Sequence, residues 1–92
     1  MKITSNIYLV GGPGKSAPSD AAIYLIRSGA EAALVDAGTG GGTDSVIRNI
    51  KGTGTEPRNV KYLFLTHCHY GHTGGAASVR NATGCKIIAH DL

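Results

Sequence analysis

The sequence has few of the residues that usually anchor an independent core. Its 92 residues include no tryptophan and one phenylalanine, whereas glycine occurs 14 times. Aromatic side chains dominate the energetics of most cores, and glycine adds chain entropy that folding must overcome. A chain of this length supports one small domain, residues 1–92, rather than two. We therefore expect a marginal core that gains from a partner surface.

Charge is sparse as well, and no part of the chain concentrates it. Charged residues make up 16% of the sequence, and the formal net charge is +3. The nine lysines and arginines form no basic run and are not interleaved with aromatic residues, whereas a groove for nucleic acid needs clustered cations. The pattern is typical of solvated surface charge and predicts no nucleic-acid partner.

Long apolar runs and a cysteine framework are also missing. The first residues, Met1–Thr4, do not open an apolar core of signal-peptide length, and no stretch approaches the length of a membrane span. Two cysteines are too few for a disulfide framework, and Cys68 lies within a histidine cluster. We expect no membrane partner, a reducing compartment and a cytoplasmic location.

Short apolar runs bounded by glycine and proline predict five strands. The runs cover residues 3–10, 21–27, 31–35, 60–65 and 85–89. The tripeptide Ser28-Gly29-Ala30 predicts a tight hairpin between the second and third strands. The run at 60–65 is the most continuously apolar, so we expect it in the interior of the sheet.

Two segments have helical character. Thr43 or Asp44 can cap a helix whose apolar stripe is Val46, Ile47 and Ile50, and a second, short helix is predicted over 74–81. This order of elements predicts the α+β class, with a mixed sheet and two helices on one of its faces. The other face, rich in apolar side chains, needs a cover that a single pair of layers does not supply.

The most informative run is Thr-His-Cys-His-Tyr-Gly-His-Thr-Gly-Gly at residues 66–75. His67 and His69 follow a predicted strand and are one residue apart, so on an extended backbone they project from the same side. His72 follows where the chain turns towards the second helix. Neutral imidazole is a common ligand for zinc and other first-row metals. The run predicts a metal site, most simply with two ligands from the strand end and a third from elsewhere; the alternative is a surface cluster without function.

Asp36 ends a predicted strand and enters a glycine-rich turn. It can serve the turn itself, or it can be a carboxylate that orients a metal-binding imidazole from behind, and the sequence alone leaves both open. Alternation points Cys68 away from His67 and His69, and we expect His90 to be a solvent-exposed or capping residue rather than a ligand.

The pattern strand-Thr-His-x-His-x-x-His-x-Gly-Gly, preceded by strand-Asp-x-Gly-Thr at 36–39, resembles the metallo-β-lactamase superfamily, and its glyoxalase II-like hydrolases in particular. The resemblance implies an αβ/βα sandwich of two similar halves, of which this chain corresponds to the N-terminal one. It also implies that His67 and His69 bind a first metal ion, that His72 binds a second and that Asp36 supports them. The expected cofactor is one or two zinc ions, with iron or manganese also compatible. The expected chemistry is attack of water on an ester, thioester, amide or phosphodiester of a small-molecule substrate.

Two departures from the family pattern weaken the expected activity. Gly71 stands where the family has an aspartate that coordinates the second metal and helps to orient the attacking water. The family's remaining ligands belong to the C-terminal half of the domain. We therefore expect this chain alone to be a weak or inactive hydrolase. The alternative is a non-catalytic metal-binding or structural half-domain, and in either case we expect a homodimer formed through the uncovered face of the sheet.

Overall fold

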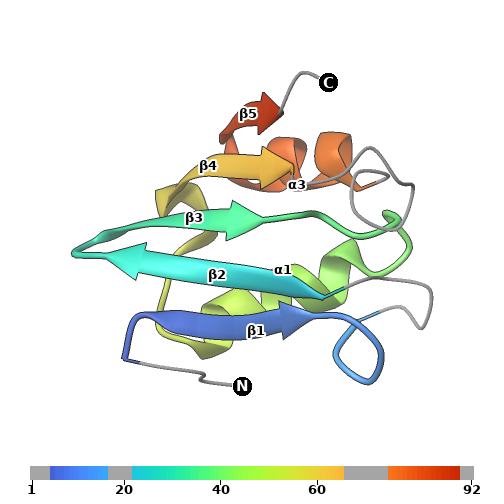
Figure 1. Cartoon of the computed structure of the whole chain (residues 1–92), viewed down its shortest axis with the longest axis horizontal. Helices are drawn as coiled ribbons and strands as arrows, with labels where there is room; N and C mark the ends of the chain where they lie inside the picture. The colour runs from blue at the N-terminus through green and yellow to red at the C-terminus, as the bar shows by residue number, and fades with distance from the viewer. Residues whose placement is uncertain (1–4, 17–21, 66–74, 90–92) are drawn as a thin grey trace.

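The computed structural model describes residues 5–16, 22–65 and 75–89. Within them the chain forms one five-stranded sheet, two α-helices and a single 3₁₀ turn (Figure 1). The elements in chain order are β1 (Ile7–Gly11), β2 (Ile23–Ser28), β3 (Glu31–Val35), α1 (Thr43–Gly52), η1 (Pro57–Asn59), β4 (Val60–Leu65), α3 (Ala76–Thr83) and β5 (Lys86–Ala89). No helix among these residues is long and apolar enough to cross a membrane.

The strands lie in the sheet in the order in which they occur in the chain. β1, β2 and β3 are joined by antiparallel pairings, whereas β3, β4 and β5 run parallel to one another. Parallel neighbours need a crossover connection, and α1 and α3 supply the two crossovers. Both helices lie behind the sheet in Figure 1, so they cover the same face. The predicted α+β class, with a mixed sheet and two helices on one face, is confirmed.

Several helix and strand boundaries are explained by the residues at the boundary itself. β3 and β4 have the predicted bounds, and Ser28 pairs with Glu31 across a two-residue turn. Gly29 has a φ of 63°, which the first central residue of a type II′ hairpin turn requires and which glycine adopts at least cost. The prediction for the start of the first helix was wrong. Gly42 occupies the cap position, no side chain caps the helix, and the hydroxyl of Thr43 donates instead to the carbonyl oxygen of Gly40 at 3.2 Å.

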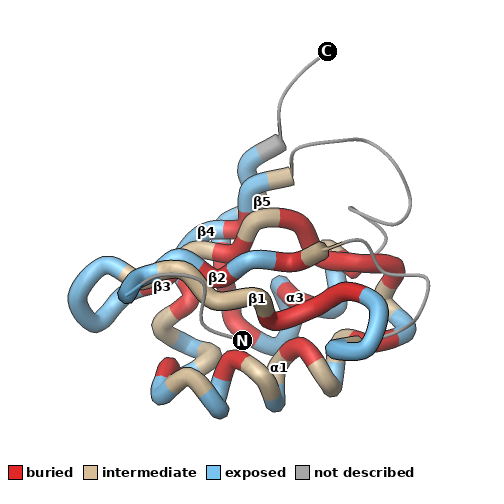
Figure 2. The backbone as a smooth tube through the Cα atoms, turned by 60° about the horizontal axis from the view of Figure 1, so that its bottom comes forward, coloured by how far each residue is buried: buried red, intermediate tan, exposed pale blue. Residues whose placement is uncertain are grey.

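The hydrophobic core lies between the sheet and the two helices. Its strand residues alternate with exposed ones, as along β2, where Ile23 and Leu25 are fully buried (Figure 2). α1 contributes Val46 and Ile50, and α3 contributes Val79. The apolar side of each crossover helix thus packs against the same face of the sheet and covers it.

The opposite side of the sheet, here called the open face, carries two cross-strand rows and, beside them, the polar pair Ser28 and Glu31. Paired residues of neighbouring strands point to the same side of a sheet, so the strand register defines both rows. The first row is Leu9, Tyr24, Val35, Phe64 and Ile88, and the second is Ile7, Ile26, Ala33, Tyr62 and Lys86. No described segment crosses this face in Figure 1. The uncovered apolar face that the sequence predicts is therefore present in the described part of the chain.

Candidate metal centre

The three parallel strands end together at one edge of the sheet, on the right in Figure 1. Val35 of β3 pairs with Phe64 of β4, and Leu65 pairs with Ala89 at the end of β5. The carboxyl ends of parallel strands are the usual place for a ligand site in an open sheet, because the connecting loops converge there. The residues that follow β3 and β4 are those in which the sequence predicts a metal site.

Asp36 is the first residue after β3, and its position is tightly fixed. It is 5% exposed, and its backbone N–H donates a 2.8 Å hydrogen bond to the carbonyl oxygen of Phe64. Its φ is 70°, and it is the one described residue other than glycine with a positive φ. Aspartate tolerates this left-handed conformation better than most residues. Asp36 thus adopts a left-handed conformation where the chain leaves β3, and it is buried beside the end of β4.

Residues 37–42 continue from Asp36 as a compact turn that leads into α1. Ala37, Gly38 and Thr39 are buried, and the hydroxyl of Thr39 accepts a hydrogen bond from the N–H of Gly41 at 3.4 Å. The Asp36 turn, meaning residues 36–42, is therefore a packed element of the structure rather than a surface loop.

Gly75 fastens the start of α3 to the Asp36 turn. Its N–H donates a 2.7 Å hydrogen bond to the carbonyl oxygen of Gly38. A Cβ atom built on Gly75 would lie 2.4 Å from the carbonyl oxygen of Ala37 and 3.0 Å from the nitrogen of Gly40, so no larger residue fits without a shift of backbone. This contact was not predicted, and the available signal was the glycine pair at 74–75, at the start of the predicted helix.

The three predicted ligands, His67, His69 and His72, lie outside the described residues, as do Cys68 and Gly71. The described parts of the chain contain no group of three histidine, cysteine, aspartate or glutamate residues that could hold a metal ion. The residues that flank 66–74 are nevertheless informative. Phe64, just before the segment, accepts a hydrogen bond from Asp36, and Gly75, just after it, donates one to Gly38. On each side of 66–74, a described residue is thus hydrogen-bonded to the Asp36 turn.

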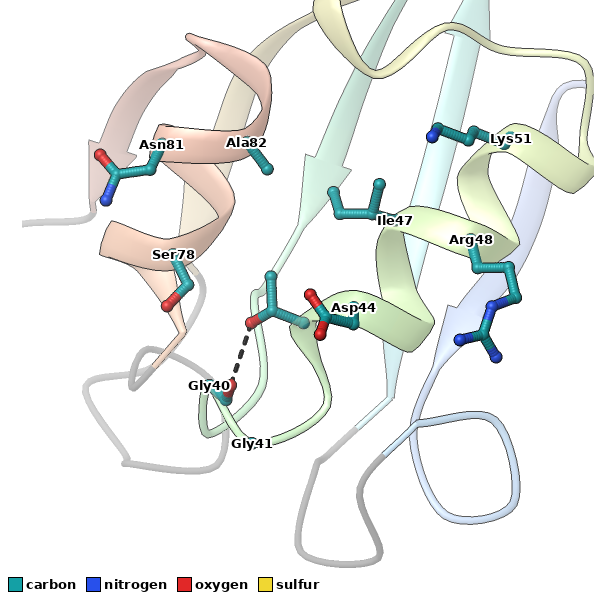
Figure 3. Close-up of a pocket in the computed structure, with 10 residues that line it drawn as sticks. Gly40, Gly41, Asp44, Ile47, Arg48, Lys51, Ser78, Asn81 and Ala82 are labelled. Carbon is teal, nitrogen blue, oxygen red and sulfur yellow. Dashed lines mark hydrogen bonds between the residues drawn. The ribbon is translucent and has the colours of Figure 1, made fainter.

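A separate cleft of about 750 Å³ lies between α1 and α3 on the helical side of the sheet (Figure 3). Its lining includes Asp44, Lys51, Ser78 and Asn81, and it reaches the Asp36 turn at Gly40. In Figure 3 the side chain of Arg48 points away from the second helix rather than across the cleft. The lining offers one carboxylate and no imidazole or thiolate, so it does not have the ligand types of a transition-metal site.

Comparison with known proteins identifies the same architecture. The sequence model of the metallo-beta-lactamase superfamily matches residues 16–92. The hydroxyacylglutathione hydrolase of Anaeromyxobacter dehalogenans is 37% identical over 67 residues, which is 73% of this chain and 24% of that protein. The corresponding protein of Rhodospirillum rubrum is 35% identical over 72 residues, which is 76% of this chain and 26% of that protein.

Among solved structures, the metallo-β-lactamase MIM-1 of Novosphingobium pentaromativorans superposes with a TM-score of 0.81 and 30% identity, covering 94% of this chain and 29% of that one. The chain therefore spans about a quarter of the length of the curated relatives that it matches. The similarity extends over nearly all of this chain but over a minor part of each relative.

Proposed function

Because the chain belongs to the metallo-β-lactamase superfamily, we propose that it supplies the metal-binding N-terminal part of a metal-dependent hydrolase. His67 and His69 bind the first metal ion, His72 binds a second, and Asp36 supports them. The donor set fits zinc, since imidazole nitrogens suit this ion. When bound, zinc would lower the pKa of water to about 7 and so supply a nucleophile at neutral pH.

The observation that supports the proposal is that Phe64 and Gly75, which lie on either side of the histidine segment, are both hydrogen-bonded to the Asp36 turn. A metal ion binds more tightly when its ligands are already held in position, because ordering a mobile ligand on binding costs entropy. The hydrogen bonds of Phe64 and Gly75 hold the described residues on either side of this segment. A carboxylate behind the ligands orients imidazole rings and selects their tautomer, and the buried Asp36 is the described residue suited to this role.

The proposed substrate class is a small molecule with an ester, thioester, amide or phosphodiester bond. We favour a thioester among these, because the chain is 37% and 35% identical to two hydroxyacylglutathione hydrolases. We propose that its hydrolytic activity is weak or absent, because Gly71 offers neither a ligand nor a charge where the family has an aspartate.

The proposed setting is the cytoplasm, because a reducing compartment keeps the thiol of Cys68 free beside the histidines. Cys85, the cysteine within the described residues, is a buried free thiol, which is compatible with such a compartment.

Metal analysis of the purified chain tests the proposal. Protein purified without added metal should contain bound zinc, and the double variant His67→Ala/His69→Ala should contain much less. Arg58→Ala, at an exposed position remote from the Asp36 turn, is the control and should bind as the parent does. Equal metal content in the parent and in the double variant would exclude a histidine metal site.

A second candidate function is a non-catalytic metal-binding or structural module, which Gly71 favours. Turnover discriminates between the two candidates. A metal-loaded chain that hydrolyses a model thioester at a rate set by its metal content is a hydrolase, whereas one that binds metal without turnover is a module.

A further inference from the structure

The cleft between α1 and α3 is a concave site separate from the strand ends that the histidines follow. Its volume of about 750 Å³ is within the range of about 300–1,000 Å³ that is usual for small-molecule sites. In Figure 3 the side chains of Asp44 and Lys51 extend from α1 towards α3. We propose that this cleft binds a short free peptide of three residues, with the peptide's ammonium group at Asp44 and its carboxylate at Lys51. This inference does not depend on the proposed metal chemistry.

The spacing of the two charges selects the length of the ligand. From Asp44 to Lys51 the helix makes nearly two turns, so both residues lie on the same side of α1, about 10.5 Å apart along its axis. An extended peptide advances about 3.3–3.6 Å per residue. Three residues therefore separate a terminal ammonium from a terminal carboxylate by about 10 Å, and two residues fall about 3.5 Å short. A segment inside a longer protein has neither terminal charge, so the site suits a free peptide.

Both charged groups are available to a ligand. Asp44 and Lys51 are exposed, and neither forms an ion pair with another described residue. Arg48 follows Asp44 at the spacing of a helical ion pair, but in Figure 3 its side chain points away from α3. Each of the two charges also complements the helix dipole at its end of α1, so ligand binding has to be measured apart from helix stability.

The walls between the two charges suit the backbone and side chains of a peptide. Ile47 lies between them on α1 and is half-buried, and Ala82 points into the cleft from α3. Ser78 brings a hydroxyl group, which can donate to a peptide carbonyl or accept from a peptide N–H. A polyamine would satisfy Asp44 but would be repelled by Lys51, and a dicarboxylate would meet the opposite mismatch. A ligand with one charge of each sign, far apart, satisfies both.

Titration of the full chain with trialanine, followed by its backbone amide signals in NMR spectra, tests the proposal. The signals of α1 and α3 should shift at low ionic strength, with an affinity in the millimolar range because the charged groups are exposed. N-acetyl trialanine lacks the ammonium group and trialanine amide lacks the carboxylate. Each should bind about 2–5-fold more weakly than trialanine, which is the contribution of one exposed ion pair. Dialanine, which reaches one charge at a time, should be weakened to a similar extent.

Matched variants assign each terminal charge to its partner. Asp44→Asn should weaken the binding of trialanine but should bind N-acetyl trialanine as the parent does, because the missing interaction is the same in both cases. Lys51→Gln should give the corresponding result with trialanine amide. Arg48→Gln removes a charge that points away from α3 and should leave the dissociation constant unchanged. Circular dichroism checks that each variant keeps its helices, and the modified peptides keep the test decisive if one does not.

Three results would overturn the proposal. The first is the absence of any shift in α1 or α3 up to the solubility limit of trialanine. The second is equal affinity for the free, acetylated and amidated peptides, or for the parent and both folded variants, because the two charges then take no part in binding. The third is tighter binding of trialanine amide or of spermidine than of trialanine, which would assign the cleft to a cationic ligand.

Discussion

The N–H of Gly75 donates a 2.7 Å hydrogen bond to the carbonyl oxygen of Gly38. This contact joins the start of α3 to the turn that follows β3, two places that are remote in sequence. It requires glycine at position 75, because a Cβ there would lie 2.4 Å from the carbonyl oxygen of Ala37. The contact fixes one end of the segment that carries the histidines.

Gly75→Ala should therefore loosen this junction. The added methyl group must displace backbone rather than a flexible side chain, so we expect a loss of about 1–3 kcal/mol in the free energy of unfolding together with weaker zinc binding. Urea denaturation and zinc titration measure the two effects. Gly52→Ala is the matched control, since a Cβ at Gly52 meets nothing within 4 Å. If Gly75→Ala has the stability and the zinc affinity of the parent, the close packing at Gly75 contributes to neither property.

Two substitutions at Asp36 separate its turn role from its metal role. Asp36→Asn keeps a residue that tolerates the observed φ of 70° and should retain the stability of the parent while lowering its zinc affinity. Asp36→Ala loses the carboxylate and adds left-handed strain of about 1 kcal/mol. Comparison of the two by urea denaturation and zinc titration isolates each contribution. If Asp36→Asn binds zinc as tightly as the parent, the carboxylate plays no part in the metal site.

Restoring a carboxylate at position 71 should strengthen the second metal site. Gly71→Asp adds the ligand type that the family pattern has there, so we expect the bound zinc to rise from about one to about two equivalents, the number of a two-metal site. Elemental analysis gives the count, and a thioester assay shows whether turnover follows. Gly71→Asn, which lacks the charge, is the control and should keep the parent's stoichiometry. No gain of metal in Gly71→Asp would mean that the second site lacks more than this one ligand.

Asn49 should be a strong determinant of stability away from the candidate centre. Its side-chain amide donates to the carbonyl oxygens of Val10 and Lys15, at 2.8 and 2.9 Å, and so holds the loop after β1 against α1. Asn49→Ala leaves both acceptors without this donor, and we expect a loss of about 1–2 kcal/mol. Arg48→Ala, at the neighbouring exposed position, should change stability by less than about 0.5 kcal/mol. Thermal unfolding followed by circular dichroism compares them.

The sequence predicts those elements whose determinants are local. β3, β4 and the hairpin at Gly29 depend on short apolar runs and on one turn residue, and all three have the predicted positions. The start of α1 was misplaced because its cap is a glycine, Gly42, rather than a residue with a capping side chain. The tethers made by Gly75 and Asn49 join residues far apart in the chain, so no local pattern encodes them.

The candidate centre likewise depends partly on local sequence patterns and partly on contacts that form only in the folded sheet. The spacing of the histidines and the glycine-rich turn after Asp36 are local patterns, and they are sufficient to name the residues. The burial of Asp36 and its hydrogen bond to Phe64 arise from the pairing of β3 with β4, which only the folded sheet supplies. His67, His69 and His72 stay predictions, since they lie outside the described residues.

The order of the strands has a consequence for how the sheet is made. Every pairing joins strands that are consecutive in the chain, so each strand can add to the edge left by the one before it. Chains are synthesised from the N-terminus at about 5–20 residues per second, and the β1–β2–β3 meander with the Asp36 turn therefore leaves the ribosome ahead of the histidines. Asp36 is thus synthesised before the histidines, and its hydrogen bond to Phe64 forms once β4 pairs with β3.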